Sequence, residues 1–274
     1  MDVVGVEDAF SFLKQRPEER MRIERRLKRK LQAALAEFEA STAAAIQRGE
    51  EPDYDALFEA LRAAVGPDIA AITTDEAMRL AADVGIVFDP AVINTDAVRW
   101  ARQYSGELVT GLTDTTRTLV REATATFAET PGMTIGDLTR MLDPAFGPVR
   151  AELIAITETT NAYSAAALEA QGQLNTTGLQ MRLIWGTAGD DLVCERCGPL
   201  NGLPEEEWKK EFPQGPSAHP GCRCFLSLTA QDDETVIPDA IERAQERVAM
   251  LEELGKEKEA ETQRERIVQL RERI

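Results

Sequence analysis

The amino-acid sequence predicts a mainly α-helical protein that carries a small, cross-linked α+β module near its C-terminus and ends in a helical tail. Three observations lead to this fold class. Apolar residues recur at spacings of three and four over much of the chain, as on one face of a helix. Strand-like stretches are confined to residues 181–187 and 225–228. All four cysteines and the only histidine lie between residues 194 and 224.

Composition sets the first limits on the class of protein and on its fold. With 274 residues and 43 % hydrophobic content, the chain can form one large or two modest domains with a core. Aromatic residues make up only 5 % and alanine is frequent, which favours packed helices over a β-sandwich. No run of apolar residues reaches the ~18 residues that a membrane-spanning segment needs, so we expect no membrane-spanning segment. The N-terminus lacks a signal peptide's basic start and long apolar stretch. We therefore expect synthesis in a reducing cytoplasm, where clustered cysteines are more often metal ligands than disulfides.

The charge is strongly acidic but uneven. A net charge of −17 repels DNA phosphates, which excludes the whole body as a nucleic-acid binder. The basic segment (residues 16–30) is the exception, because its eight basic residues against three glutamates give +5 locally. It could meet an acidic partner or DNA, or it could be a solvated helix face. Its basic residues are Arg16, Arg20, Arg22, Arg25, Arg26, Lys28, Arg29 and Lys30.

Helix signals fill the first half of the chain. The expected helices span, in order, 7–48, Asp53 to Gly66-Pro67, 74–84, Asp89-Pro90 to Pro131-Gly132, and 134–142. Asp53 is a good N-cap for the second of these helices. Thr134 is the expected cap of the last one, with Asp137 three residues on as an imperfect capping box.

The second half changes character after Gly172. An Ala- and Ile-rich helix is expected over 147–174, followed by two short strands that pair and bring two clusters of metal-binding side chains together. Between the strands, Cys194 to Gly221 is rich in Gly and Pro and is expected to be mostly loop. From Pro238 the chain is helical again, with a lapse after Gly255. This pattern suits a coiled coil or docking on a partner, and equally a tail that orders on assembly.

The cysteines and the histidine form a candidate zinc site. The motif Cys194-x2-Cys197 is followed by His219, Cys222 and Cys224, which gives five candidates for the four positions of a closed structural site. One choice is all four thiolates. The other, which we favour slightly, is Cys194, Cys197 and His219 with Cys222 or Cys224, the remaining cysteine lying beside the site. Disulfides or free thiols are the alternatives. A zinc staple suits a Gly/Pro-rich region that buries little apolar surface.

Enzyme chemistry fits this cluster less well. A cysteine nucleophile needs a thiolate beside an imidazole, whereas four crowded thiols make a better metal cage. A histidine-metal nuclease would need two or more histidines, and a zinc deaminase needs His-x-Glu before Cys-x2-Cys. The glycine-containing stretch 198–202 lacks the lysine of a phosphate-binding loop. We therefore predict no catalytic residues and no enzymatic activity.

The cysteine region resembles a known family, the phage Mu F-like minor head proteins, also called the phage head morphogenesis domain. The resemblance rests on motifs that recur in order, and it covers roughly residues 90–228. The motifs are, in order, Gly132-Met133-Thr134 through Leu138, Arg150-Ala151 through Thr157-Glu158, Ile184-Trp185-Gly186-Thr187, Asp190-Asp191, Cys194-x2-Cys197, Leu200-Asn201-Gly202 and His219-Pro220-x-Cys222-Arg223-Cys224. One departure is Ile156 where the family has Arg or Lys before Thr-Glu, so Glu158 is expected to be a paired helix residue.

The resemblance implies a structural virion protein of a phage or prophage. Such a protein acts in head morphogenesis, lies inside the head near the portal, and is in the host cytoplasm during assembly. Its implied partners are the portal protein and other head proteins, with packaged DNA contacted through the basic segment. The domains are then an N-terminal helical region (1–88), the head morphogenesis domain (89–230, with the Cys/His module at 181–228) and the tail (231–274). The rival hypotheses are a nuclease or toxin-like enzyme that uses the Cys/His site, and a cellular zinc-binding adaptor.

Overall fold

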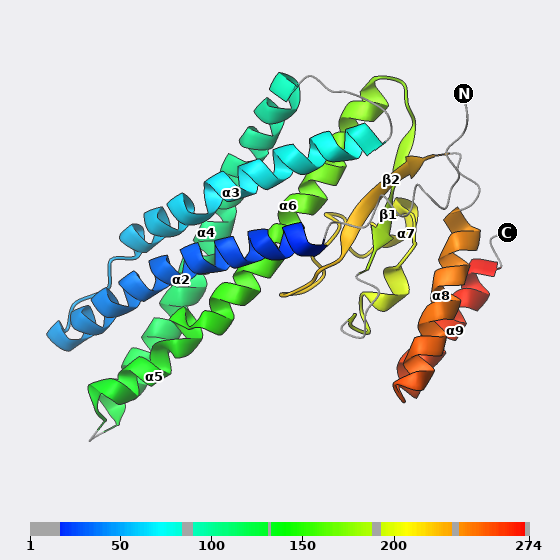
Figure 1. Ribbon diagram of the computed structural model, residues 1–274. Helices are drawn as coiled ribbons and strands as arrows, with labels where there is room; N and C mark the ends of the chain where they lie inside the picture. The colour runs from blue at the N-terminus through cyan, green and yellow to red at the C-terminus, as the bar shows by residue number, and fades with distance from the viewer. Residues whose placement is uncertain (1–16, 84–89, 131–132, 188–192, 232–235, 272–274) are drawn as a thin grey trace. The chain divides into compact units, whose positions relative to one another are not determined.

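The described part of the chain is mainly helical with one small sheet, as the sequence predicts (Figure 1). This computed structural model describes residues 17–83, 90–130, 133–187, 193–231 and 236–271. The long helices are α2 (Pro17–Arg48), α3 (Tyr54–Asp83), α4 (Pro90–Glu129), α5 (Ile135–Phe146), α6 (Pro148–Thr176), α8 (Val236–Glu253) and α9 (Glu257–Arg271). None of the described helices is both long and apolar enough to cross a membrane. Residues 7–16, Asp89, Pro131-Gly132 and Asp190-Asp191, which carry some of the predictions above, lie outside the described residues.

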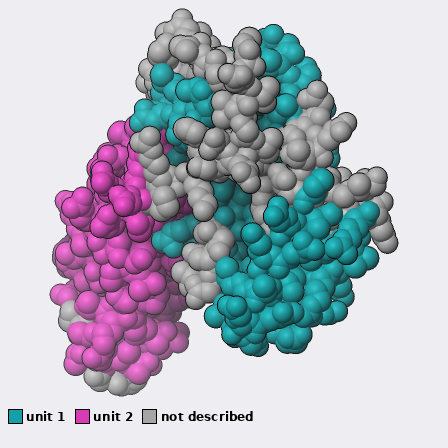
Figure 2. Space-filling view, turned by 45° about the vertical axis from the view of Figure 1, so that its right-hand side comes forward, with its two compact units in different colours: residues 1–15, 73–93, 160–274 teal, residues 16–72, 94–159 magenta. Residues whose placement is uncertain are grey.

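The chain divides into two compact units whose segments alternate along the sequence (Figure 2). Unit 1 comprises residues 1–15, 73–93 and 160–274, and unit 2 comprises residues 16–72 and 94–159. The cysteines and the histidine all belong to unit 1, whereas the basic segment belongs to unit 2. The division into domains at 1–88, 89–230 and 231–274 stays a prediction.

Unit 2 is a helical body held by a leucine-rich core. The apolar face of α2 recurs every three or four residues and is buried, as its spacing predicts. The ring of Phe38 lies 5.9 Å from that of Tyr54 on α3 and 5.9 Å from that of Phe146 on α5. Fully or nearly fully buried residues of this core include Leu27, Leu31, Leu35, Leu57, Leu61, Val65, Ile69, Leu138 and Leu142.

Helix α3 corrects the predicted break at Gly66-Pro67. Instead of two helices, one at 53–67 and one at 74–84, a single helix runs from Tyr54 to Asp83 through Pro67. Asp53 does cap it, since its Oδ1 accepts from the backbone N–H of Ala56 at 3.0 Å. Val65 and Ile69 on either side of the proline are fully buried. Burial of a continuous apolar face therefore outweighs the hydrogen bond that Pro67 removes.

Helix α5 begins with the capping box that the sequence suggests. The Asp137 backbone N–H donates to Thr134 Oγ1 at 3.3 Å, and the Thr134 backbone N–H donates to Asp137 Oδ2 at 2.7 Å. The box is complete, although aspartate replaces the more usual glutamate. The helix continues beyond the predicted end at residue 142 to Phe146.

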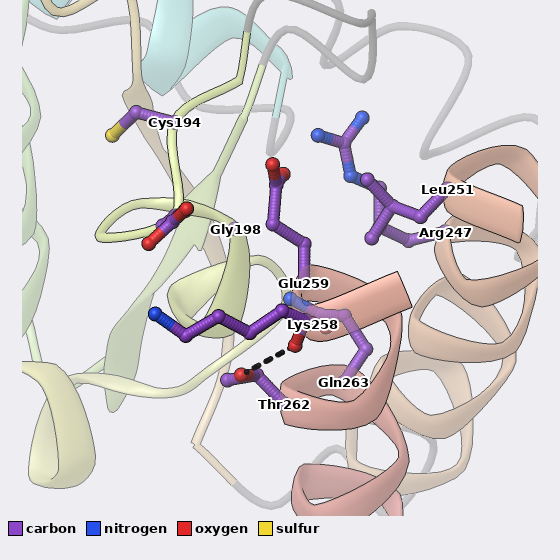
Figure 3. A pocket seen from close by; sticks show the side chains of 9 residues that line it. Cys194, Gly198, Arg247, Leu251, Lys258, Glu259, Thr262 and Gln263 are labelled. Carbon is purple, nitrogen blue, oxygen red and sulfur yellow. Dashed lines mark hydrogen bonds between the residues drawn. The ribbon is translucent and has the colours of Figure 1, made fainter. Parts of the chain in front are cut away.

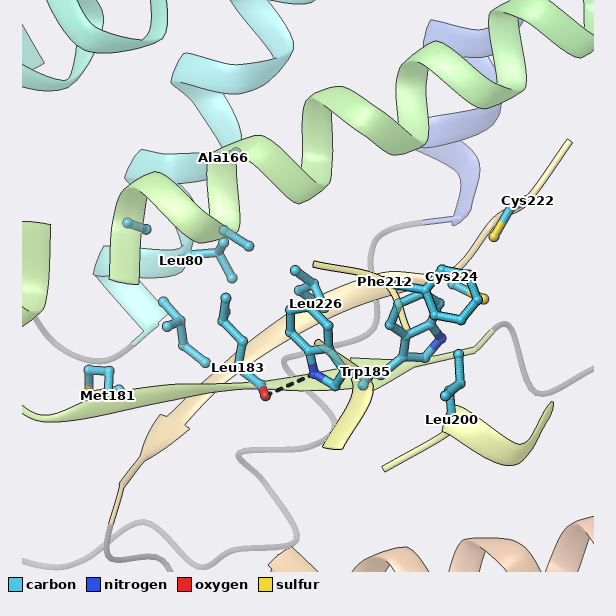
Figure 4. Packing of buried hydrophobic residues seen from close by; sticks show 14 of the residues in the cluster. Leu80, Ala166, Met181, Leu183, Trp185, Leu200, Phe212, Cys222, Cys224 and Leu226 are labelled. Carbon is cyan, nitrogen blue, oxygen red and sulfur yellow. Dashed lines mark hydrogen bonds between the residues drawn. The ribbon is translucent and has the colours of Figure 1, made fainter. Parts of the chain in front are cut away.

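The sheet in unit 1 is the predicted antiparallel pair. Strand β1 (Met181–Gly186) pairs with β2 (Phe225–Ala230), with Leu183 opposite Leu228 and Trp185 opposite Leu226. Between the strands lie the short helices η1 (Gly198–Leu200) and α7 (Glu205–Trp208), and the other residues described there are largely loop. Trp185 and Trp208 are fully buried and meet edge to face at 5.8 Å. Cys222 and Cys224 belong to the same apolar cluster (Figure 4).

The helical tail folds into a hairpin within unit 1. Helices α8 and α9 lie side by side and pack on each other (Figure 1). Gly255, at φ +69°, makes the turn, and the N–H of Lys256 donates to the carbonyl of Leu251 at 2.9 Å. The lapse of the apolar pattern after Gly255 is therefore a turn between two helices that pack on each other, rather than a break in a single extended tail.

Candidate metal centre

The first half of the site is the turn from Cys194 to Cys197 that leads into η1. Its backbone closes when the N–H of Gly198 donates to the carbonyl of Cys194 at 2.9 Å. The N–H of Cys197 also points at the Cys194 sulfur, 3.3 Å away. The turn is therefore held by two backbone N–H groups, one of which donates to the Cys194 sulfur. Cys197 is 1 % exposed, and Cys194 is partly exposed.

The second half is a tight turn followed by the start of β2. In His219-Pro220-Gly221-Cys222 the Cys222 N–H donates to the His219 carbonyl at 3.1 Å, and Gly221 has φ +78°. Proline second and glycine third are the residues that a type II turn requires. Cys224 follows two residues after Cys222, and side chains two apart in an extended segment point to the same face. Both cysteines are buried.

The structure brings all five predicted residues together as two overlapping triads. The donor atoms of Cys194, Cys197 and His219 lie within 4.8 Å of one another, and so do those of Cys197, Cys222 and Cys224. Cys197 belongs to both. Its sulfur is 3.8 Å from that of Cys222, and the Cys194 sulfur is 3.2 Å from His219 Nε2. Each triad could hold a metal ion, and all four cysteines are free rather than joined in disulfides.

These separations suit a tetrahedral ion. With bond lengths of about 2.3 Å to sulfur and about 2.0 Å to nitrogen, two thiolates on one zinc lie about 3.8 Å apart, and a thiolate and an imidazole nitrogen about 3.5 Å apart. The two contacts above fall at or near these values. A disulfide would need sulfurs about 2.05 Å apart.

The histidine is oriented for coordination through Nε2. Its Nδ1 lies 2.9 Å from the carbonyl oxygen of Pro220. Because a carbonyl can only accept, Nδ1 is the donor in this contact, and the neutral ring then has its lone pair on Nε2, the nitrogen that lies near Cys194. A ring N–H bonded to a backbone carbonyl is the usual outer contact of a metal-ligating histidine.

The buried thiols perturb one another strongly. Hydrogen bonds from the thiols of Cys197 and Cys224 lower the pKa of Cys222 to about 2. The hydrogen bond with Cys222, the one with Cys224 and burial raise the pKa of Cys197. One thiolate is thus favoured at the expense of its neighbours, since like charges this close repel. A cation among them would relieve that repulsion.

Helix α6 fixes the second half from outside. Thr160 Oγ1 donates to the carbonyl of Cys222 at 2.5 Å, and Thr160 is fully buried. Next to it, Asn161 Oδ1 accepts from the backbone N–H of Ser217 at 3.2 Å and from its hydroxyl at 2.9 Å. Two adjacent polar residues therefore hold both ends of the loop that carries His219.

Sequence reasoning missed these supporting residues. Thr160 and Asn161 lie in the family-like helix but had no role there, although a polar run inside an Ala-rich helix is a usable signal. Arg247 on α8 was missed too, although its spacing from Ala244 and Leu251 puts it on the buried face. Glu158, expected to be a paired helix residue, is 4 % exposed.

Comparison with known proteins bears on the same region. Residues 122–227 match the family model described as Phage Mu protein F like protein. This segment is thus similar to the phage head morphogenesis family. The resemblance seen in the sequence is confirmed, with an N-terminal limit at residue 122 rather than near 90. The matched segment contains α5, α6, β1, the first residues of β2 and every metal-ligand candidate. No curated protein and no solved structure matches the chain.

Proposed function

We propose that the protein is a minor head protein of a phage or prophage, a virion component that associates with the portal during head morphogenesis. The observation that carries this proposal is the family match over residues 122–227, which supports a phage head morphogenesis role. Its partners are the portal protein and other head proteins. It is made in the host cytoplasm and ends inside the head near the portal.

Co-fractionation tests this role. The protein is expressed with the portal and major head proteins encoded beside it, and assembled heads are purified by sedimentation. We expect a low, fixed number of copies in the heads and retention on immobilised portal. Absence from the heads together with failure to bind portal would contradict the proposal. Neighbouring genes without a portal or terminase would favour the cellular adaptor instead.

We further propose that four of Cys194, Cys197, His219, Cys222 and Cys224 are the ligands of one structural zinc ion, and that the fifth lies beside it. The donor set is one that zinc prefers, and the contacts among these residues suit a tetrahedral ion. The shared position of Cys197 favours it as a ligand in either choice of four. Structural zinc in small modules contributes roughly 10 kcal/mol of apparent binding free energy, which fits a loop-rich segment between two short strands.

The cluster serves the fold rather than catalysis in this proposal. Cys222, the thiol with the lowered pKa, is 2 % exposed and so is closed to a substrate. His219 would need a free thiolate beside it and access for a substrate. Replacing His219 by Ala should loosen the metal or destabilise unit 1. Loss of a measurable nuclease or hydrolase activity with metal content and stability unchanged would support the enzyme alternative.

Fewer charges of the basic segment are available for DNA than its sequence suggests. Four of its charges are used inside unit 2: Arg20 pairs with Glu24 at 3.0 Å, Lys28 with Glu152 at 2.7 Å, and Arg26 and Lys30 with Asp68 at 3.2 and 2.8 Å. Arg22, Arg25 and Arg29 are exposed and lie at spacings of three and four, on one face of α2. We propose that this stripe contacts packaged DNA.

Salt dependence tests the stripe. Each phosphate contact contributes roughly 0.9 to the slope of log affinity against log salt. Changing Arg22, Arg25 and Arg29 to Gln should reduce the slope by about 2 to 3. The matched control changes three exposed arginines elsewhere in unit 2, Arg48, Arg62 and Arg140. Equal slopes for the two triple variants, or no DNA binding at low salt, would contradict the DNA contact.

A further inference from the structure

A buried arginine of the C-terminal hairpin reaches the first half of the metal centre. Arg247 on α8 is 9 % exposed, and its Nη2 donates to the carbonyl oxygen of Val193 at 3.0 Å. Val193 directly precedes Cys194. The other guanidinium nitrogen, Nη1, lies 3.2 Å from the Met250 sulfur. The Val193 carbonyl is therefore a partner of this buried guanidinium, and the contact ties α8 to the loop.

The second helix of the hairpin covers the end of the same turn. Gln263 on α9 is 3 % exposed, and α9 packs on η1. A Cβ added to Gly198 would come 3.1 Å from Gln263 Nε2, so the Gln263 side chain lies close to the Gly198 backbone. Gly198 directly follows Cys197. Both ends of the segment with the first two thiols are therefore touched by the hairpin, at Val193 by α8 and at Gly198 by α9.

The space between the hairpin and the loop is small. Figure 3 shows it with Cys194 and Gly198 on the loop side, Leu251 on α8 and Lys258 on α9. Its volume of about 30 Å³ leaves room for about one water molecule. Cys194, which is the partly exposed thiol of the cluster, lines this space from the loop side.

We propose that the α8–α9 hairpin is a latch on the metal centre and that Arg247 is its positioning residue. Docking of α8 holds the Val193 carbonyl and so presets the turn that carries Cys194 and Cys197. The inference rests on the zinc site proposed above. It goes beyond that site by making metal retention depend on a segment outside the matched residues 122–227.

Reciprocity gives the proposal its quantitative form. If a docked hairpin strengthens metal binding by some factor, bound metal must strengthen hairpin docking by the same factor. A hydrogen bond from a charged donor is worth roughly a ten- to hundredfold change in an equilibrium. We therefore expect Arg247→Ala to weaken zinc affinity about tenfold or more. We expect zinc to slow amide hydrogen exchange in residues 244–251 of the wild-type protein by a similar factor.

The experiment uses the full chain. Zinc affinity is measured by competition with a chromophoric chelator for the wild type, Arg247→Ala, Arg247→Lys and Arg271→Ala. Arg271 is the matched control, an exposed arginine in the last turn of α9. Amide exchange of the wild-type hairpin is measured with and without zinc, so the proposal stays testable if Arg247→Ala does not fold. Arg247→Lys, which keeps one donor for the Val193 carbonyl, should recover part of the affinity.

The outcomes separate this inference from the proposal on which it rests. A wild-type protein that binds no zinc would remove the metal site, and the latch with it. Zinc binding that is unchanged in Arg247→Ala, with hairpin exchange that does not respond to zinc, would overturn the latch and leave the site standing. A loss of stability in Arg247→Ala that is equal with and without zinc, at unchanged affinity, would show a structural role only and would also overturn the latch.

Discussion

At the scale of single residues, the two triads share Cys197 and offer a choice among the other four residues for the remaining three ligands. The triad with His219 is partly exposed, whereas the triad with Cys222 and Cys224 is buried. Cobalt in place of zinc distinguishes the choices, because its visible spectrum responds to the number of thiolate ligands. We expect Cys197→Ser to abolish the thiolate-to-cobalt absorption. Of the other four single variants, to Ser for cysteine or Ala for histidine, we expect three to lose or shift it and one to keep it.

Thr160 gives a second residue-scale prediction. Its hydroxyl satisfies the Cys222 carbonyl in a buried setting. Thr160→Val keeps the shape but leaves that carbonyl unpaired, which should cost about 1–3 kcal/mol in the urea unfolding of unit 1. Thr176→Val is the matched control, since Thr176 lies in unit 1 and its Oγ1 donates to the carbonyl of Gln173 in its own helix. Equal losses in the two variants would contradict the assigned role of Thr160.

The ligand candidates could be predicted from the sequence because their residue types are rare and clustered. All five come together, and the His-Pro-Gly-Cys turn follows from the ordinary preferences of proline and glycine. The supporting residues could not be predicted, because Thr160 and Arg247 act through backbone carbonyls that are remote in sequence. The polar run in α6 and the spacing on α8 indicate that these residues are buried, but they do not indicate which carbonyl each one contacts.

At the scale of elements, the cap of α5 predicts a pH dependence. Hydrogen bonds from the side chain and then the backbone of Thr134 lower the pKa of Asp137 below its ordinary value of 3.8. A lowered native pKa stabilises the fold above pH 3.8, and this stabilisation is lost as pH falls through the native value. The wild type should therefore be more stable than Asp137→Asn at neutral pH, and the difference should shrink in acid.

Unfolding of both proteins by urea over a range of pH measures this difference. Taking the difference between the two removes the acid effects of other carboxylates that they share. A gap in stability that stays constant, or that grows as pH falls below 3.8, would contradict the proposed ionised cap.

Helix α3 shows where local signals fail at this scale. Gly66-Pro67 predicts a break, yet Val65 and Ile69 are fully buried and the helix continues. Burial of the whole apolar face determines that the helix continues. This burial depends on partner helices, which the local sequence does not reveal. In the tail the local signal is correct, because Gly255, with its positive φ, ends α8 as glycines commonly end helices. Its lapse in the apolar pattern did not reveal that α9 folds back on α8.

At the scale of the whole molecule, the two compact units predict a divided response to metal removal. The metal centre, the sheet and the hairpin lie in unit 1, whereas the leucine-rich core of α2, α5 and most of α3 lies in unit 2. Chelation should increase amide hydrogen exchange in β1, β2 and α8 and leave α2 and α5 close to their original protection. Uniform loss of protection through both units would contradict this division of stability.

The central claim is that a single zinc ion joins the Cys194–Cys197 turn to the segment from His219 to Cys224. Native mass spectrometry of the purified full chain, with elemental analysis of the same sample, tests it most directly. The account predicts about one zinc per chain and a metal-free Cys197→Ser variant. A folded wild-type chain that carries no metal, with all four thiols open to modification, would contradict it.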